Sequence, residues 1–303
     1  MKRAAIVIPV LGAMLGMCTG SFGQDSSKPA AQNPPAAQAT PPAQAAGQAA
    51  GQAAPAGKRP PKVNSQEEFA AYKAAAALTD AAAVEKAADD FAAKYPDSEL
   101  RPLLYRSAMQ RYQMANNADK MLEMGKNILA IDPDDPEALV ATAQVLAERT
   151  RDTDLDRDQR LAEARKDAER SLSTVETDIP TSGYPPEQLA SYKGYLRSEA
   201  YAVLGKLSSD AKNWPDAESE LRKSIDAFPQ QVDSIAVLRL AVALDMQNKI
   251  PEALKYADQA VELTKDRPDS GAGKAARDEK DRLTKLNVGA APGPAQTATP
   301  PKN

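Results

Sequence analysis

A helix-period pattern of small and apolar residues recurs through the middle of this chain, and proline interrupts it at similar intervals. Pro96, Pro133 and Pro229 each follow such a segment. Proline ends a helix because it lacks an N–H donor and its ring clashes with the preceding turn. A pattern that repeats between such breaks predicts helix–turn–helix units that stack on their neighbours, since one unit alone cannot bury its apolar face.

Composition favours thin layers of helices over a single thick core. Apolar residues make up 42% of the chain but aromatic residues only 5%, and the mean hydropathy is -0.51. Alanine supplies much of the apolar fraction, so large buried side chains are scarce and small ones allow helices to approach closely. A generic antiparallel bundle with alanine-rich crossings is the alternative. The recurring proline spacing favours the solenoid.

The clearest unit spans residues 201–229 and reads YAVLGKLSSDAKNWPDAESELRKSIDAFP. Its small residues would let two antiparallel helices approach, while its larger apolar residues fill the space between them. The segment resembles a tetratricopeptide repeat (TPR), a helix–turn–helix unit of about 34 residues. On this pattern and its poorer copies, the residues assigned to packing within the repeats are Tyr105, Tyr112, Tyr201, Leu204, Gly205, Ala217, Leu221, Pro229 and Ala253.

Five such units in series cover roughly residues 66–267. Residues 271–286 then have the polar outer face that a solenoid needs at its open end. The resemblance therefore implies an all-α TPR solenoid of about five helix–turn–helix units with a C-terminal capping helix, flanked by disordered segments.

The N-terminus has the pattern of a secretory signal peptide over residues 1–23. Two basic residues precede an apolar run that is too short to span a membrane, and small residues at Ser21 and Gly23 suit cleavage before Gln24. Lipidation at Cys18 is the alternative, which Met17 disfavours because that processing needs a small residue there. The mature chain is predicted to be exported, periplasmic or extracellular, and to contain no transmembrane segment.

The rest of the chain divides by composition into three segments. Residues 24–62 are rich in Ala, Pro and Gln and are predicted to form a disordered linker, because they bury too little apolar surface to offset their ordering entropy. Residues 63–287 form the predicted solenoid domain, and residues 288–303 a second disordered tail. The whole chain has a net charge of -4. Residues 1–63 carry +5 and the tail carries +1, so the middle of the chain carries -10. Such an acidic domain argues against nucleic-acid binding.

Two residue counts argue against an enzyme. The chain contains no His and one Cys, which removes His-based acid–base chemistry and the usual zinc and haem ligand sets. We expect no catalytic residues and no cofactor.

One acidic loop resembles a calcium-binding loop in its spacing. About ten residues are inserted between predicted helices at about 136–149 and 157–174, and such an insertion belongs on the surface. Arg157 occupies the place where a calcium loop needs glycine. A solvated loop in which Asp156 or Asp158 caps the second helix is the preferred interpretation. The weak metal candidates are Asp152, Asp154, Asp156 and Glu163.

The resemblance to TPR proteins also implies a partner surface. TPR arrays line a concave groove with the first helix of each unit and bind a protein or peptide there. The groove residues implied by this register are Arg106, Gln110, Gln113, Leu139, Ala143, Lys206, Leu238, Arg239 and Val242. Ordinary solvated helix positions are the alternative reading. Tyr192 and Tyr195 form a second candidate surface, although tyrosines at that spacing often pack against a neighbouring helix.

The kind of TPR protein can be narrowed further by resemblance. Chaperone-binding TPR clamps use Lys and Asn at first-helix positions where this chain has Arg106, Gln110 and Val140. The junction FAAKYPDSELRP looks more like that of envelope TPR proteins, including outer-membrane assembly lipoproteins. The resemblance therefore implies a non-enzymatic exported scaffold. The alternative is a structural envelope component that its N-terminal arm tethers near the membrane or cell wall.

Overall fold

The computed structural model describes residues 57–180 and 184–289. The predicted signal peptide, residues 24–56 of the linker and the tail from residue 290 lie outside these ranges. The described ranges contain helices and no named strand, in the order α1 (Gln66–Ala76), α2 (Ala81–Lys94), α3 (Arg101–Met114), α4 (Ala118–Ile131), α5 (Pro136–Arg149), α6 (Arg157–Thr174), α7 (Pro186–Asp210), α8 (Trp214–Ala227), α9 (Ser234–Asp245), α10 (Ile250–Leu263) and α11 (Gly271–Gly289).

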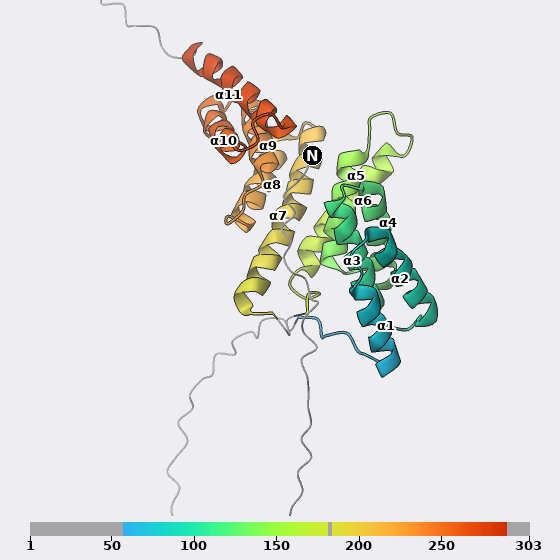
Figure 1. Cartoon of the computed structure of the whole chain (residues 1–303). Coiled ribbons are helices and arrows are strands. Elements are labelled where there is room, and N and C mark those ends of the chain that lie inside the picture. The colour runs from blue at the N-terminus through green and yellow to red at the C-terminus, as the bar shows by residue number, and fades with distance from the viewer. Residues whose placement is uncertain (1–56, 181–183, 290–303) are drawn as a thin grey trace, which may run out of the picture. The chain divides into compact units, whose positions relative to one another are not determined.

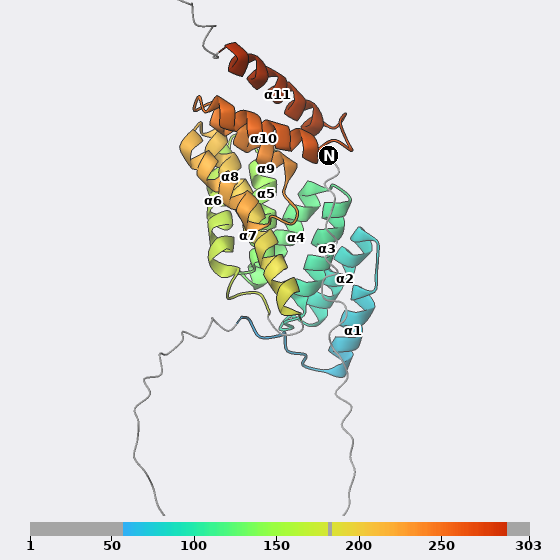
Figure 2. The same cartoon turned by 90° about the vertical axis from the view of Figure 1, so that its left-hand side faces the viewer.

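Each helix packs chiefly against its neighbours in the chain. Figure 1 shows the resulting hairpins, in which α1–α2, α3–α4, α5–α6, α7–α8 and α9–α10 form five units. The last helix, α11, packs on α10 and α9, as Figure 2 shows for α10. This arrangement confirms the predicted all-α solenoid of five helix–turn–helix units and a final helix. The third unit has the predicted bounds for both of its helices.

Several of the helices begin where the sequence supplies a side-chain cap. Ser65 and Glu68 form a reciprocal capping box at α1, in which each side chain accepts a hydrogen bond from the other residue's backbone N–H. Asp80, Asp135 and Asp233 accept from backbone N–H groups at the starts of α2, α5 and α9. Each cap satisfies a donor that would otherwise lack a partner at a helix N-terminus.

The turns within three units share an unusual backbone conformation. Asn116, Lys212 and Asn248 have φ values of 56°, 57° and 61° and lie between the two helices of their units. Asparagine tolerates this left-handed region, but a lysine side chain crowds its own carbonyl there. The repeat is therefore visible in the backbone as well as in the packing, and Lys212 is its strained member.

We expect Lys212→Gly to raise the free energy of unfolding by up to about 1 kcal/mol, because glycine adopts positive φ without steric cost. Lys212 is exposed, so no packing is lost. Lys212→Ala is the matched control and should change stability by less than about 0.5 kcal/mol, since alanine keeps the Cβ that causes the strain. Urea denaturation followed by circular dichroism measures both variants. A loss of stability in the glycine variant would contradict this account.

Small residues set the closest helix crossings. A Cβ added to Gly205 in α7 would lie 2.6 Å from Cγ of Leu221 in α8, and Ala217 nearby is fully buried. Gly125 in α4, where the repeat usually has a large residue, plays the same part, because a Cβ there would lie 2.7 Å from Cγ2 of Thr142 in α5. Gly125 thus permits a second close helix crossing, and its small size does not leave a gap in the core.

Most of the other residues assigned to repeat packing are buried. The rings of Tyr105 and Tyr112 are buried, and their hydroxyls donate to Asp89 and Glu85 of α2. Leu204, Leu221 and Ala253 are buried, while Tyr201 is half-buried and Pro229 is exposed just beyond the end of α8.

The described part begins at Gly57, six residues before the predicted start of the domain. Lys58, Arg59 and Lys62, which the sequence assigned to the disordered linker, form polar contacts with the turns between units. This departs from the prediction for these residues, and the reason is electrostatic: a basic segment meets carboxylates that composition alone did not place beside it.

Candidate functional site

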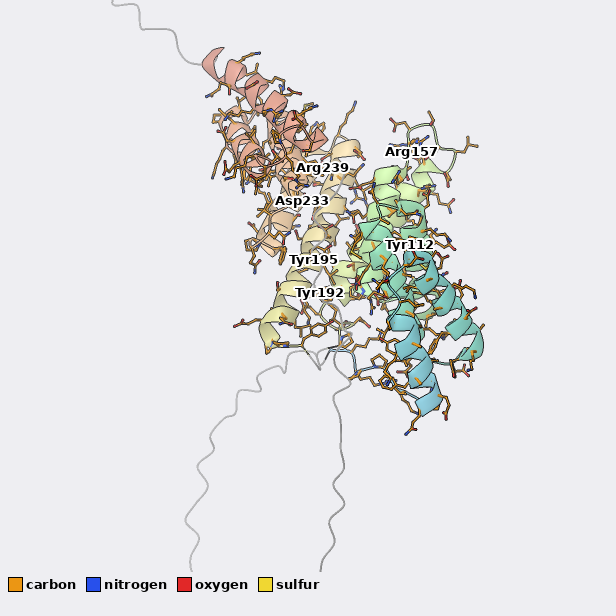
Figure 3. All side chains as sticks on the ribbon, viewed as in Figure 1. Tyr112, Arg157, Tyr192, Tyr195, Asp233 and Arg239 are labelled. Atoms are coloured by element: carbon orange, nitrogen blue, oxygen red, sulfur yellow. The ribbon has the colours of Figure 1, made fainter. Side chains whose placement is uncertain are left out.

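The first helices of three successive units enclose one small hollow. It lies between α5, α7 and α9 and is shallow, with a cavity volume of about 10 Å³, room for roughly one water molecule. Two of the predicted groove residues, Lys206 and Arg239, line it, and Figure 3 labels Arg239 with its neighbour Asp233. Its lining consists of Gln144, Ala147, Glu148, Glu199, Ala202, Val203, Lys206, Asp233 and Arg239.

The charges of this hollow are mixed and already engaged. Lys206 forms an ion pair with Asp210, one turn further along α7. Gln144, Glu148, Glu199 and Arg239 each have an interaction partner as well. The sequence places these cations in a segment of net charge -10, and the tertiary structure places acidic side chains directly around them. A ligand here would have to exchange partners with these groups.

Arg106, the third predicted groove cation, is part of a buried network. Its guanidinium pairs with Asp135, and its Nε lies 3.0 Å from Oε2 of Glu137. Gln110 donates to Oε1 of the same Glu137 at 2.9 Å, and the Tyr192 hydroxyl donates to Oε2 at 2.6 Å. The network thus joins α3, α5 and α7, the first helices of three units.

Burial and charge act together in this network. Burial by itself would lower the pKa of Arg106, but the carboxylates of Asp135 and Glu137 outweigh it and raise that pKa above its usual value. Burial and the negative charge of Glu137 raise the pKa of the Tyr192 hydroxyl well above 10. Arg106 therefore stays charged and Tyr192 neutral, and their pairing makes Arg106 a structural residue instead of a free groove cation.

The second candidate surface is occupied by packing too. Tyr192 and Tyr195 lie one turn apart on α7 (Figure 3). Besides its bond to Glu137, Tyr192 stacks on Tyr184 with ring centroids 6.5 Å apart. Tyr195 meets the ring of Phe228 edge-on at 5.9 Å. Both tyrosines therefore join helices of the solenoid, which is the alternative that their spacing allowed.

The remaining groove predictions fall into two groups. Leu139 and Ala143 are 2% and 0% exposed, so they belong to the core. Gln113 is exposed, and Leu238 and Val242 are half-buried. The structure therefore brings Lys206 and Arg239 together in the hollow and places the other predicted residues elsewhere.

The acidic loop between α5 and α6 has local partners for its carboxylates. Arg157, labelled in Figure 3, pairs with Asp152 and Asp158. Asp154 accepts a hydrogen bond from the backbone N–H of Arg151 at 2.8 Å. Asp156 is the N-cap residue of α6, but its side chain accepts no capping hydrogen bond, so the cap predicted there does not form. Its Oδ2 lies 3.9 Å from Nη1 of Arg160. Glu163 lies 3.8 Å from Lys126. Within the described ranges, no three acidic, His or Cys residues gather in a way that could hold a metal ion.

The sequence reasoning missed the acidic partners of both sites. Asp210 follows Lys206 by four residues on α7, a spacing that could have suggested their ion pair. Asp135 could have been found as the N-cap before Pro136, a role it has in the structure. Nothing local connects Glu137 with Tyr192, because they are 55 residues apart and meet only when the units stack.

Even α7, the longest helix with 25 residues, lacks an apolar stretch fit to cross a bilayer, and the same holds for every other helix in the ranges described.

Comparison with known proteins finds similar solved structures. No family model and no curated protein matches the chain. Among solved structures, the chain is similar to the assembly chaperone of RpL4 (Acl4), residues 1–338, with 14% sequence identity, a TM-score of 0.38, and coverage of 74% of this chain and 99% of that one. At this level of similarity the architecture rests on the helices themselves: residues 57–180 and 184–289 form an all-α solenoid of five helix pairs and a final helix.

Proposed function

We propose that this protein is a non-enzymatic TPR scaffold that binds a protein or peptide segment in the hollow between α5, α7 and α9. The observation that carries the proposal is that the first helices of three successive units line one depression. In TPR arrays this is the surface that faces a ligand. Close crossings at Gly205 and a shared turn conformation at Asn116, Lys212 and Asn248 support the TPR assignment.

The lining suits a segment that carries both charge and small apolar groups. Ala202 and Val203, which are 9% and 6% exposed, offer small apolar surfaces. Lys206 and Arg239 offer donors to carboxylates or backbone carbonyls once they exchange their present partners. Glu148, Glu199 and Asp233 would discriminate against strongly acidic partners by repulsion. We infer an extended partner segment with isolated charges of both signs and no long acidic run.

We further propose that the scaffold acts outside the cytoplasm, in the periplasm or extracellular space. The signal-like pattern of residues 1–23 supports this. Cleavage before Gln24 would remove Cys18 and leave a chain without cysteine. The stacked helices need no disulfide, which suits an oxidising compartment.

A charge-reversal experiment tests the hollow. A photo-crosslinking residue in place of Gln144, which lines the hollow and is half-buried, captures the partner from the native compartment. The affinity of this partner for the unlabelled protein is then measured by titration. Lys206→Glu, Arg239→Glu is expected to weaken binding at least about tenfold with an unchanged circular dichroism spectrum, because two donors become like charges beside Glu148 and Glu199.

The matched control is Lys86→Glu, Lys274→Glu, which makes the same change of net charge at exposed positions outside the hollow. This control should bind within about twofold of the wild type, since distant surface charges contribute little at physiological salt. Equal weakening in both double variants would show only a general charge effect. Undiminished binding in the Lys206, Arg239 variant would remove the hollow as the site.

A second candidate function, a structural envelope component tethered by its N-terminal arm, is favoured by a different observation. Residues 58–62 contact the solenoid, so the arm is attached to it by side-chain and backbone bonds as well as by the chain.

A further inference from the structure

A basic segment at the start of the described residues binds the turn between the first two units. The Arg59 guanidinium donates to both carboxylate oxygens of Glu99, at 2.7 and 2.6 Å. The backbone N–H of Lys62 donates to the same carboxylate at 2.8 Å. A paired arginine–carboxylate contact of this kind is stronger and more directional than a single ion pair. Glu99 therefore holds both ends of the Arg59–Lys62 segment.

Lys58 extends the contact to two further turns. Its ammonium pairs with Asp132 and lies 3.8 Å from Asp178, and its backbone forms an isolated parallel bridge with Pro180. Its side chain is 36% exposed, and those of Asp132 and Asp178 are 22% and 26% exposed, so these charges are partly screened from water. The segment thus reaches carboxylates that are distant in the sequence.

The three carboxylates all lie in connections between successive units. Glu99 lies between α2 and α3, Asp132 between α4 and α5, and Asp178 between α6 and α7. Each belongs to a connection from one unit to the next. Because the repeat returns the chain to the same edge after every unit, one extended segment can contact all three. We call this row of Glu99, Asp132 and Asp178 the acidic edge.

The sequence of the segment suits an extended ligand of such an edge. Pro60 and Pro61 restrict the backbone between Arg59 and Lys62, which lowers the entropy lost on binding, and they present no N–H group that would need a partner. Single surface ion pairs contribute little, but several contacts made by one short stiff segment share a single ordering cost.

We propose that residues 58–62 are an electrostatic strap, which holds the start of the N-terminal arm on the acidic edge, ties four successive units together, and opens when its charges are screened or displaced by another basic segment. The strap does not depend on the hollow between α5, α7 and α9. In a protein tethered by its N-terminal arm, the strap would attach the arm directly to the solenoid at Lys58.

Limited trypsin digestion of the full-length protein tests the strap, because trypsin cuts after Lys58 and Lys62 but not after Arg59, which proline follows. A synthetic peptide of residues 55–66 gives the cleavage rate of unprotected sites.

The triple variant Glu99→Gln, Asp132→Asn, Asp178→Asn keeps both cleavage sites and removes the carboxylates that pair with the strap. We expect it to be cut there at least about tenfold faster than the wild type, with unchanged circular dichroism. About 0.5 M salt, where charges are screened within roughly 4 Å, should accelerate cleavage of the wild type and hardly affect the variant.

The matched control is Asp134→Asn, two residues from Asp132 in the same turn, whose carboxylate pairs with Arg170 at 2.7 Å and not with the strap. It should be cut at the wild-type rate. Arg59→Gln changes the strap without touching the solenoid and should accelerate cleavage after Lys62. Wild-type cleavage at the rate of the free peptide, or a triple variant as resistant as the wild type, would overturn the proposal.

Discussion

Replacing Gly205 with leucine is expected to lower the free energy of unfolding by about 3 kcal/mol. Even a Cβ at this position would lie 2.6 Å from Cγ and 2.8 Å from Cδ2 of Leu221. Leu221 is fully buried, so its side chain has no open space into which it could move. The crossing of α7 and α8 must widen, and the contacts on both sides of it are then lost. Urea denaturation of the wild type and the variant gives the difference.

Two further variants separate overpacking from helix propensity. Gly205→Ala should also destabilise, by about 1 kcal/mol, although alanine favours a helix by a similar amount over glycine. Gly271→Ala is the matched control, because a Cβ at Gly271 in α11 has no atom within 4 Å. The control should be neutral or slightly stabilising. If Gly205→Ala also proved stabilising, the α7–α8 crossing would have to be wider than described here.

Removing the charge of Arg106 is expected to cost still more. Arg106→Met keeps most of the side-chain volume but leaves Asp135 and Glu137 without their cation, and Asp135 is only 4% exposed. Breaking a buried ion pair from one side typically costs about 3–5 kcal/mol, because a charge stays buried without compensation. We expect a loss in this range at neutral pH, measured by urea denaturation.

The comparison variant is Lys86→Met, whose pair with Asp90 has side chains 76% and 67% exposed. Its effect should stay within about 0.5 kcal/mol, as is usual for solvent-exposed pairs. Tyr192→Phe, which removes one hydrogen bond to Glu137, should fall between the two at about 1 kcal/mol. A loss below about 1 kcal/mol for Arg106→Met would mean that water already solvates these carboxylates.

The expected loss of stability at Arg106 also determines which variants can test binding at the hollow. A charge reversal at Arg106 would unfold the protein or weaken it generally, so reduced binding would say nothing about contact with a partner. Lys206 and Arg239 line the hollow without belonging to the Arg106 network. Reversal at these two positions is therefore the informative change.

The sequence by itself determined the architecture, because local sequence patterns specify the helices and the turns between them. Prolines such as Pro96 and Pro133 and small residues such as Gly205 act within one helix or one hairpin. The helices expected at about 136–149 and 157–174 have the bounds of α5 and α6. The ten-residue insertion between α5 and α6 was likewise visible as a break in the repeat spacing. Repeats make such a reading reliable, since each unit contacts chiefly its neighbours.

Only the tertiary structure decided which partners each charged side chain meets. Arg106 and Arg239 occupy similar positions in the repeat, yet Arg106 meets Glu137 and the Tyr192 hydroxyl from later units, while Arg239 lines a hollow. In the same way, Lys58 finds Asp132, 74 residues away. A helix-period pattern states which face a side chain occupies, but not which charge from another unit will face it. Burial and pairing depend on that second fact, so the network and the strap emerge only once the units are stacked.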